Sequence, residues 1–307
     1  MKLENNNDNK QQTHYMELGI GMFGDLIFDF QTKRYQSASQ RLREIVEEVK
    51  LADELGVDLF AIGEHHREDY AVAAPEIMLA SLATVTKNIK LSSGVNVISS
   101  ADPVKLYQDF SMIDLISDGR AEIMAGRGSF IESFPVFGYS LDDYDELFDE
   151  KLNLLLHFRD NEKVTWNGKF RAPLSNLTLY PQAERKIPIS IAVGGTPSSV
   201  ERAARLGLPI VFAIIGGRPA RFKSLLDFYR EEYLKHGHDP KEIKIGVHSH
   251  TFISDSDSEI MDNYYPRYAH SMNKIGKEIE RFAGTALYTA AFLTGAVGAS
   301  ATVLWMD

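Results

Sequence analysis

The chain of 307 residues contains no cysteine, which excludes disulfide bonds, thiolate metal sites and cysteine nucleophiles. Basic residues are also few, because 33 Lys and Arg stand against 43 Asp and Glu and give a net charge of −10. That balance argues against nucleic acid or an anionic membrane as the main partner. The lack of disulfides fits a reducing compartment, so we expect a cytoplasmic protein.

Long apolar runs are missing from most of the chain. Residues 1–14 are polar and rich in Asn, Gln and Lys, which is typical of a disordered leader and not of a secretory signal. At the other end, residues 282–307 form an apolar tail in which 282–305 carry no charge. Three interpretations of this tail stay open: a degenerate eighth strand–helix unit with 303–305 as its last strand, a foreign or out-of-frame end, or a membrane anchor.

Between these ends, over 15–281, short apolar segments alternate with segments of helical periodicity. Strands are expected at 17–23, 58–63, 89–98, 121–125, 187–193, 209–215 and 243–253. Helices are expected at 39–56, 75–87, 103–116, 142–158, 200–206, 219–236 and 256–274. Parallel neighbours need a crossover helix, so the alternation predicts a parallel sheet. Seven or eight such units favour a single α/β domain, a (β/α)8 barrel, over an open sheet.

The alternation breaks once, after the fourth helix. Residues 163–181 contain apolar side chains at every second position, such as Val164 and Trp166, around an Asn167-Gly168 pair. This pattern indicates an inserted hairpin or a long loop.

Charged side chains follow two of the expected strands. Glu64, His65 and His66 come directly after 58–63, and Arg127 stands between two glycines after 121–125. Barrel enzymes place their chemistry at the carboxyl ends of the strands, so these residues are candidates for a site. The Glu-His-His group suits a metal half-site, an acid–base pair or a structural role. Arg127 suits either a bidentate phosphate contact or an ion pair with a loop carboxylate.

A glycine-rich corner follows the fifth strand. Residues 194–199 read Gly-Gly-Thr-Pro-Ser-Ser and lead into a helix. Backbone N–H groups and hydroxyls at such a helix start suit a phosphate, although a glycine turn with a capped helix is the alternative. The spacing matches neither the P-loop nor the dinucleotide-binding fingerprint. Together with Arg127, this corner suggests a phosphorylated ligand.

Two further histidines allow a different hypothesis. His248 and His250 lie two apart on an expected strand, so they face the same side. With His65 they suit the metal site of a barrel hydrolase. Their expected place is the middle of the strand 243–253 and not its end, so we favour a site without metal. We expect Asp114 and the turn at 118–120 to have structural roles.

In chain order, these motifs resemble those of bacterial luciferase-like, flavin-dependent monooxygenases. The similarity runs from about residue 17 to 276. Its motifs are Ala-Ile-Gly-Glu-His-His at 61–66, Asp-Pro-Val at 102–104, Gly-Arg-Ala-Glu at 119–122, Gly-Arg-Gly-Ser-Phe at 126–130, Phe-Gly at 137–138, Gly-Gly-Thr-Pro at 194–197 and Ala-Ala-Arg-Leu-Gly-Leu-Pro at 203–209.

The resemblance implies a (β/α)8 barrel that takes reduced FMN from a separate reductase. The enzyme would use this FMN with dioxygen to oxidise a small organic substrate. His65 matches the catalytic histidine of the family, with Glu64 beside it, and the unperturbed pKa of histidine would let it exchange a proton near neutral pH. Deazaflavin-dependent relatives share the barrel, but the Glu-His-His motif favours FMN. A homodimer formed through the second and third helices is also implied.

The resemblance assigns the cofactor-binding residues as well. Arg127 matches the arginine that holds the FMN phosphate, and Gly195, Thr196 and Ser199 match the loop that completes this phosphate site. Gly94, Val95 and Asn96 match the backbone under the isoalloxazine ring, where family members can carry a non-proline cis peptide bond.

The sequence departs from the family pattern in two places. Gly126 stands where the luciferase subunit has a reactive cysteine, so aldehyde luminescence is not implied. The last helix–strand–helix portion of the family is not recognisable after residue 277. A barrel that fails to close would leave its first and seventh strands unpaired. A C-terminally defective, non-catalytic flavin-binding barrel is therefore a further alternative.

Overall fold

The computed structural model describes residues 16–128, 130–215, 219–282 and 301–306. Seven parallel strands make up most of its main sheet, and each pairs in parallel with the next. They are β1 (Glu17–Met22), β4 (Leu59–Ile62), β5 (Lys90–Ser93), β7 (Ala121–Gly126), β10 (Ile189–Val193), β11 (Ile210–Ile214) and β12 (Ile245–His250). The predicted barrel is therefore confirmed.

The eighth position of the barrel is filled in an unexpected way. Strand β13 (Ala301–Met306) lies between β12 and β1 and closes the ring, but it runs antiparallel to both. A strand in the tail was one of the three interpretations, and its direction differs from that of a regular strand–helix unit. β1 and β12 are consequently paired on both sides, so the unpaired edges that a barrel without closure would have are not found in these two strands. The segment 283–300, on which the membrane-anchor interpretation rests, lies outside the described residues.

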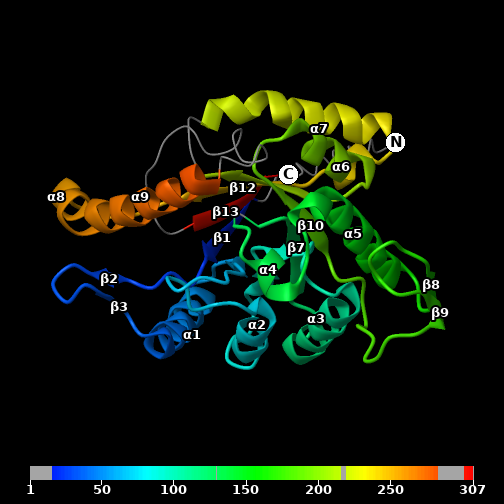
Figure 1. The fold of residues 1–307 in the computed structure, drawn as a ribbon, viewed down its shortest axis with the longest axis horizontal. Coiled ribbons are helices and arrows are strands. Elements are labelled where there is room, and N and C mark those ends of the chain that lie inside the picture. The colour runs from blue at the N-terminus through cyan, green and yellow to red at the C-terminus, as the bar shows by residue number, and fades with distance from the viewer. Residues whose placement is uncertain (1–15, 129, 216–218, 283–300, 307) are drawn as a thin grey trace, which may run out of the picture.

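The helices surround this sheet, with α1, α2 and α3 on one side of it and α6 and α7 on the opposite side (Figure 1). The longer helices are α1 (Ala38–Glu54), α2 (Pro75–Ala83), α3 (Pro103–Ser117), α5 (Tyr144–Asp160), α6 (Pro197–Arg205), α7 (Lys223–Lys235) and α9 (Tyr265–Phe282). Shorter turns are α4 (Ser133–Phe137), α8 (Asp257–Glu259), η1 (Leu141–Asp143), η2 (Pro219–Phe222), η3 (Pro240–Glu242) and the π-helical η4 (Ile260–Tyr264). No described helix combines the length and the apolar character needed to span a bilayer.

Local sequence signals explain where the helices begin. The Ser37 hydroxyl accepts a hydrogen bond from the Gln40 N–H at the start of α1, and Asp102 caps α3 in the same way. Proline occupies the first turn of α2, α3 and α6, where its missing N–H costs nothing. The interruption at 163–181 contains the hairpin of β8 (Val164–Trp166) and β9 (Leu174–Leu177), as predicted. A second small hairpin pairs β2 (Phe28–Asp29) with β3 (Arg34–Tyr35).

The core has two layers. A large outer cluster of buried side chains fills the space between the strands and the helices. A separate small cluster consists of Leu59, Met124 and Val211. These three come from β4, β7 and β11, which are not neighbours in the sheet, so their contact crosses the interior of the barrel. The barrel is thus a packed core, and its carboxyl rim is left for chemistry.

Arg120 ties three elements together below that rim. Its guanidinium donates hydrogen bonds to the backbone carbonyls of Ala83, Thr86, Ile89 and Ser117 and to the Thr86 hydroxyl. Asp114 in turn accepts two hydrogen bonds from the Arg185 guanidinium. The structural roles expected for Asp114 and for the turn at 118–120 are therefore confirmed.

We expect Arg120→Ala to lower the free energy of unfolding by roughly 2–4 kcal/mol, because the carbonyls of buried residues lose charged donors. Urea denaturation followed by circular dichroism measures the change. Arg43→Ala is the matched control, since exposed Arg43 donates to Ser39 within its own helix. This control variant should change stability by less than about 0.5 kcal/mol. Equal midpoints for the two variants would contradict this role for Arg120.

Candidate active site

His65 lies at the carboxyl end of β4 between aromatic rings. Its ring stacks on Tyr70 with centroids 4.2 Å apart, and it meets Phe23 and Phe130 edge-on at 5.2 and 5.5 Å. The backbone N–H of His65 donates to the Val72 carbonyl at 2.9 Å. These contacts hold the imidazole in one orientation at the rim. Phe23 and Tyr70 were not singled out from the sequence, and Phe130 entered only as the last residue of the motif at 126–130, because aromatic residues are common in cores and only the fold places these three together.

Burial changes the chemistry expected of His65. Loss of hydration, reinforced by the positive charge of Arg67, lowers the pKa of His65 to about 3. Its Nδ1 atom is buried and has no hydrogen-bond partner in the part of the chain that the structure describes. The expectation that His65 exchanges a proton near neutral pH is therefore wrong for this state of the protein. The imidazole is uncharged at pH 7.

Glu64 fixes the neighbouring strand end. Its Oε2 accepts a hydrogen bond from the Val97 N–H at 2.8 Å, and its Oε1 lies 2.8 Å from His66 Nε2. The Glu64 N–H donates to the Val95 carbonyl at 3.1 Å. The side chain and backbone of Glu64 thus hold both sides of the residue at position 96. Glu64 therefore holds the backbone at 95–97 in place at the carboxyl rim.

The third expected strand is interrupted where the resemblance places the flavin ring. β5 ends at Ser93, the Gly94–Val95 peptide bond is cis, and the short strand β6 (Asn96–Val97) then pairs with β7. A Cβ atom at Gly94 would lie 2.9 Å from Ala61 Cβ, so the strands approach too closely there for a side chain. The Asn96 amide donates to the Glu76 carboxylate. The cis bond implied by the resemblance is confirmed.

Gly126 has a similar steric role. A Cβ atom added to Gly126 would lie 2.7 Å from both methyl groups of Val95. The reactive cysteine of the luciferase subunit therefore does not fit at this position unless Val95 moves. This crowding gives a physical reason for the departure from the family pattern.

Arg127, Thr196 and Ser199 come together at the rim, although 69 residues separate the arginine from the threonine. Arg127 Nη2 donates to Ser199 Oγ at 3.0 Å, and Thr196 Oγ1 donates to the same oxygen at 2.8 Å. Thr196 is the N-cap residue of α6, yet its side chain makes no capping hydrogen bond. Gly195 directly precedes it with a φ of +111°. The Ser199 hydroxyl thus faces the guanidinium, and the Thr196 hydroxyl faces Ser199.

Arg127 also makes the ion pair that the sequence allowed as an alternative. Its Nη1 atom lies 2.6 Å from Asp145 Oδ1, and its guanidinium lies 5.1 Å from the centre of the Tyr144 ring. The two alternatives for Arg127 are therefore compatible. The arginine holds a carboxylate in the geometry that suits an anionic oxygen of a ligand.

His248 and His250 also lie at this rim. β12 ends at His250, so the expected strand 243–253 was too long and the histidines are not in its middle. Both face Phe23, with ring centroids at 5.5 and 6.2 Å. Among the described residues, three ligand atoms come within 4.8 Å of one another only in the surface group Glu201, Glu232 and His236. The three-histidine metal site is therefore wrong as a geometry.

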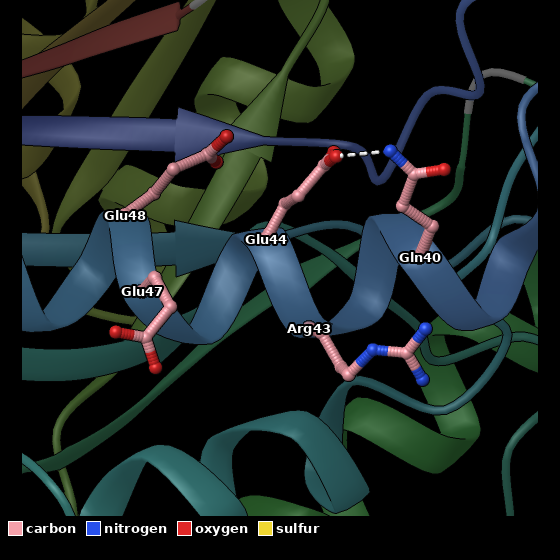
Figure 2. A pocket seen from close by; sticks show the side chains of 5 residues that line it. All are labelled: Gln40, Arg43, Glu44, Glu47 and Glu48. Carbon is pink, nitrogen blue, oxygen red and sulfur yellow. Dashed lines mark hydrogen bonds between the residues drawn. The ribbon is translucent and has the colours of Figure 1, made fainter.

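A hollow on the outer face of α1 offers no alternative site. It is lined by Gln40, Arg43, Glu44, Glu47 and Glu48. Figure 2 shows these side chains spreading from a single helix, with Gln40 bonded to Glu44. Glu47 pairs with Lys50 in the same way. These contacts are those of a solvated helix face.

A closed barrel with an arginine–hydroxyl corner and a buried histidine at one rim is suited to hold an anionic ligand beside an uncharged reaction site. A family model described as luciferase-like monooxygenase matches residues 22–297. The chain therefore belongs to the luciferase-like monooxygenase family, and the resemblance found in its motifs is confirmed.

Two curated relatives illustrate the range of this similarity. The chain is 26% identical over 223 residues to the alkanal monooxygenase alpha chain of a Kryptophanaron alfredi symbiont, covering 72% of this chain and 62% of that protein. It is 32% identical over 182 residues to N-acetyl-S-alkylcysteine monooxygenase of Bacillus subtilis (strain 168), covering 58% of this chain and 52% of that protein. The chain thus spans less than two thirds of the length of either relative.

Solved structures share the fold. The oxygenating constituent of 3,6-diketocamphane monooxygenase from Pseudomonas putida, in complex with FMN, superposes with a TM-score of 0.68 at 21% identity, covering 88% of this chain and 79% of that one. An F420-dependent secondary alcohol dehydrogenase in complex with an F420–acetone adduct superposes with a TM-score of 0.60 at 19% identity, covering 75% and 68%. At these identities the likeness shows the fold alone.

The buried histidines predict a pH-dependent stability. The unfolded chain binds a proton on His65 near pH 6.5, whereas the folded protein resists that proton until about pH 3. Stability is therefore unaffected above pH 6.5 and falls as the pH drops below it, by up to about 1.4 kcal/mol per pH unit. His65→Phe should reduce the loss of stability between pH 7 and pH 5, measured by urea unfolding at both values.

Leu106→Ala is the control for this experiment, because Leu106 is buried in the outer layer and carries no titratable group. It should lower stability equally at the two pH values. The role of His65 is refuted if the two variants lose the same free energy between pH 7 and pH 5.

Proposed function

We propose that the protein is a flavin-dependent monooxygenase that uses reduced FMN and dioxygen to oxidise a small organic substrate. The observation that carries this proposal is the corner of Arg127, Thr196 and Ser199 at the carboxyl rim. Membership of the luciferase-like monooxygenase family supports it. The fold it shares with an enzyme solved in complex with FMN is consistent with this cofactor.

The residues present fit a phosphate-bearing cofactor. A phosphate needs several donors and a positive charge, and the guanidinium of Arg127 with the hydroxyls of Thr196 and Ser199 supplies both. In this structure the Asp145 carboxylate pairs with Arg127 and so occupies a position that an anionic group of the ligand could take. Because Asp145 is largely exposed, a phosphate can displace it at little cost.

The ring end of the cofactor would lie over the backbone at Gly94, Val95 and Asn96. Glu64 holds this segment through the hydrogen bonds to Val95 and Val97. Reduced FMN, when bound, supplies the electrons for the reaction with dioxygen. His65 would be the catalytic residue beside it, an uncharged imidazole whose buried Nδ1 is available for a hydrogen bond to the reacting molecule while the surrounding rings exclude water.

Two partners follow from the proposal. A separate reductase would supply reduced FMN, as the resemblance to luciferase-like monooxygenases implies. A homodimer through α2 and α3 is supported by large apolar side chains that these helices expose, among them Ile77, Met112 and Ile116. Sedimentation equilibrium tests the dimer, and a monomer at micromolar concentration would remove it.

The phosphate corner is tested by two substitutions with opposite effects. Arg127→Ala should weaken FMN binding by roughly 10- to 100-fold, because a charged donor to the phosphate is lost. Asp145→Asn should strengthen FMN binding roughly two- to fivefold, because a competing carboxylate is removed. Titration of the full chain with FMN, followed by flavin fluorescence, measures both.

Riboflavin, which lacks the phosphate, is the matched control ligand. Its affinity should be the same for the wild-type protein, Arg127→Ala and Asp145→Asn. A wild-type protein without FMN affinity, or an Arg127→Ala variant that binds FMN normally, would refute the proposal. Tight binding of F420 in place of FMN would instead assign the barrel to deazaflavin chemistry, the alternative that the dehydrogenase fold neighbour favours.

A further inference from the structure

His248 and His250 form, with Phe23 and His65, a cluster of rings at the carboxyl rim, which we call the histidine cluster. Both histidines project from β12 toward Phe23, and the Phe23 ring also contacts His65. The four residues come from the ends of β1, β4 and β12, which β13 and the barrel closure bring together. The proposed cofactor site assigns no role to His248 or His250.

The cluster contains polar atoms that lack partners. His248 is only 8% exposed, and its Nε2 makes no hydrogen bond to any described residue. The same holds, within the described ranges, for His250 Nδ1, His65 Nδ1 and the Tyr264 hydroxyl. Buried polar groups in native proteins nearly always have partners, so four unsatisfied atoms near one rim point to a ligand that satisfies them.

Contacts between aromatic rings connect His250 with Tyr268, Tyr264 and Phe252. His250 lies 5.9 Å from Tyr268, which stacks against Tyr264 at the same distance. Tyr264 also stacks on Phe252 at 4.3 Å. It ends the π-helical turn η4, a form of helix that is frequent at functional sites. A group of aromatic rings of this kind suits contact with a flat or bulky apolar molecule, and its few polar atoms suit one or two oxygen atoms.

The charge state of the cluster restricts the ligand further. Burial lowers the pKa of His248 to about 4 and that of His250 as well, so both rings are neutral at pH 7, as His65 is. Arg67, whose charge acts on His65, is already paired with Asp69 at 3.0 Å and Glu132 at 2.9 Å. A buried carboxylate or phosphate group would therefore find no compensating cation in the histidine cluster.

We propose that the histidine cluster is the substrate site, with His248 and His250 as its specificity-determining residues, and that it takes an uncharged ring compound bearing a carbonyl or hydroxyl oxygen. A neutral imidazole presents one donor and one acceptor, so it binds either kind of oxygen. The assignment as substrate rests on the proposed monooxygenase function, because it places this molecule at the same rim as the flavin.

The test compares two probes of similar size on the same ring system, one with an acetyl group and one with a negatively charged carboxylate. 2-Acetonaphthone is an uncharged ketone, and 2-naphthoate is the corresponding anion. Their dissociation constants for the full chain at pH 7.5 are measured by ligand-observed NMR titration, with and without FMN. The wild-type protein should bind the ketone at least tenfold more tightly than the anion. Equal affinities, or tighter binding of naphthoate, would overturn the proposal whatever the variants show.

His248→Phe keeps the ring and removes its nitrogen atoms. It should weaken binding of 2-acetonaphthone about fivefold or more while leaving FMN affinity unchanged, as expected for one lost hydrogen bond. His157→Phe is the control, because His157 packs against Trp166 on the outside of the barrel. If His248→Phe does not fold, the affinity of His250→Phe for 2-acetonaphthone is measured in its place. Unchanged ketone binding in every variant that folds would overturn the assignment of the histidines.

Failure of the proposed function gives a different pattern. If FMN does not bind but the ketone binds in a His248-dependent manner, the flavin proposal fails and the ligand assignment stands. If FMN binds through Arg127 but the ketone does not bind, the flavin proposal stands and this inference fails.

Discussion

At the carboxyl ends of β4, β5 and β7, the side chains of Ala61 and Val95 occupy the space that a side chain at Gly94 or Gly126 would need. An added Cβ at Gly94 or Gly126 would come within 3 Å of Ala61 or Val95. This close approach lets the backbone and the carboxylate of Glu64 reach across to Val95 and Val97. A larger residue at either glycine would push the strands apart and release the segment that carries the cis peptide bond.

The rim built on this constraint has two electrostatic environments. On one side, the charges of Arg127 and Asp145 face each other near solvent, with the hydroxyls of Thr196 and Ser199 beside them. On the other side, burial keeps the imidazoles of His65 and His248 uncharged. A molecule with a charged tail and a neutral reacting group fits such a division, because each part finds its own kind of surroundings.

The closure of the barrel is as important as its rim. His248 and His250 lie on β12, and among the described strands β13 connects β12 to β1 by pairing with both. Phe23, just beyond β1, contacts both histidines as a result. The antiparallel direction of β13 satisfies the same backbone groups that a parallel strand would, so a short strand without its own helix can complete the ring.

Much of this organisation could be predicted from the sequence. The alternation of apolar segments with segments of helical periodicity predicted the barrel, because the spacing of apolar residues indicates which side chains face the core. Charged residues after strand ends predicted Glu64, His65 and Arg127 as rim residues, because the fold places all such ends on one face. The assignments of individual residues to FMN stay predictions. Strand ends were less certain, and His248 and His250 were placed too far from the rim for that reason.

Only the tertiary structure decided the charge of His65, the contacts between β1 and β12, and the direction of β13. Each of these depends on residues far apart in the chain: Phe23 and His248 meet across more than 200 positions. A pKa is set by the packing around a group, and strand direction by pairing with distant neighbours. The sequence by itself determined which side chains could carry chemistry. The fold decided which of them meet and in what state of charge, because hydration and distance are properties of packing and not of order along the chain.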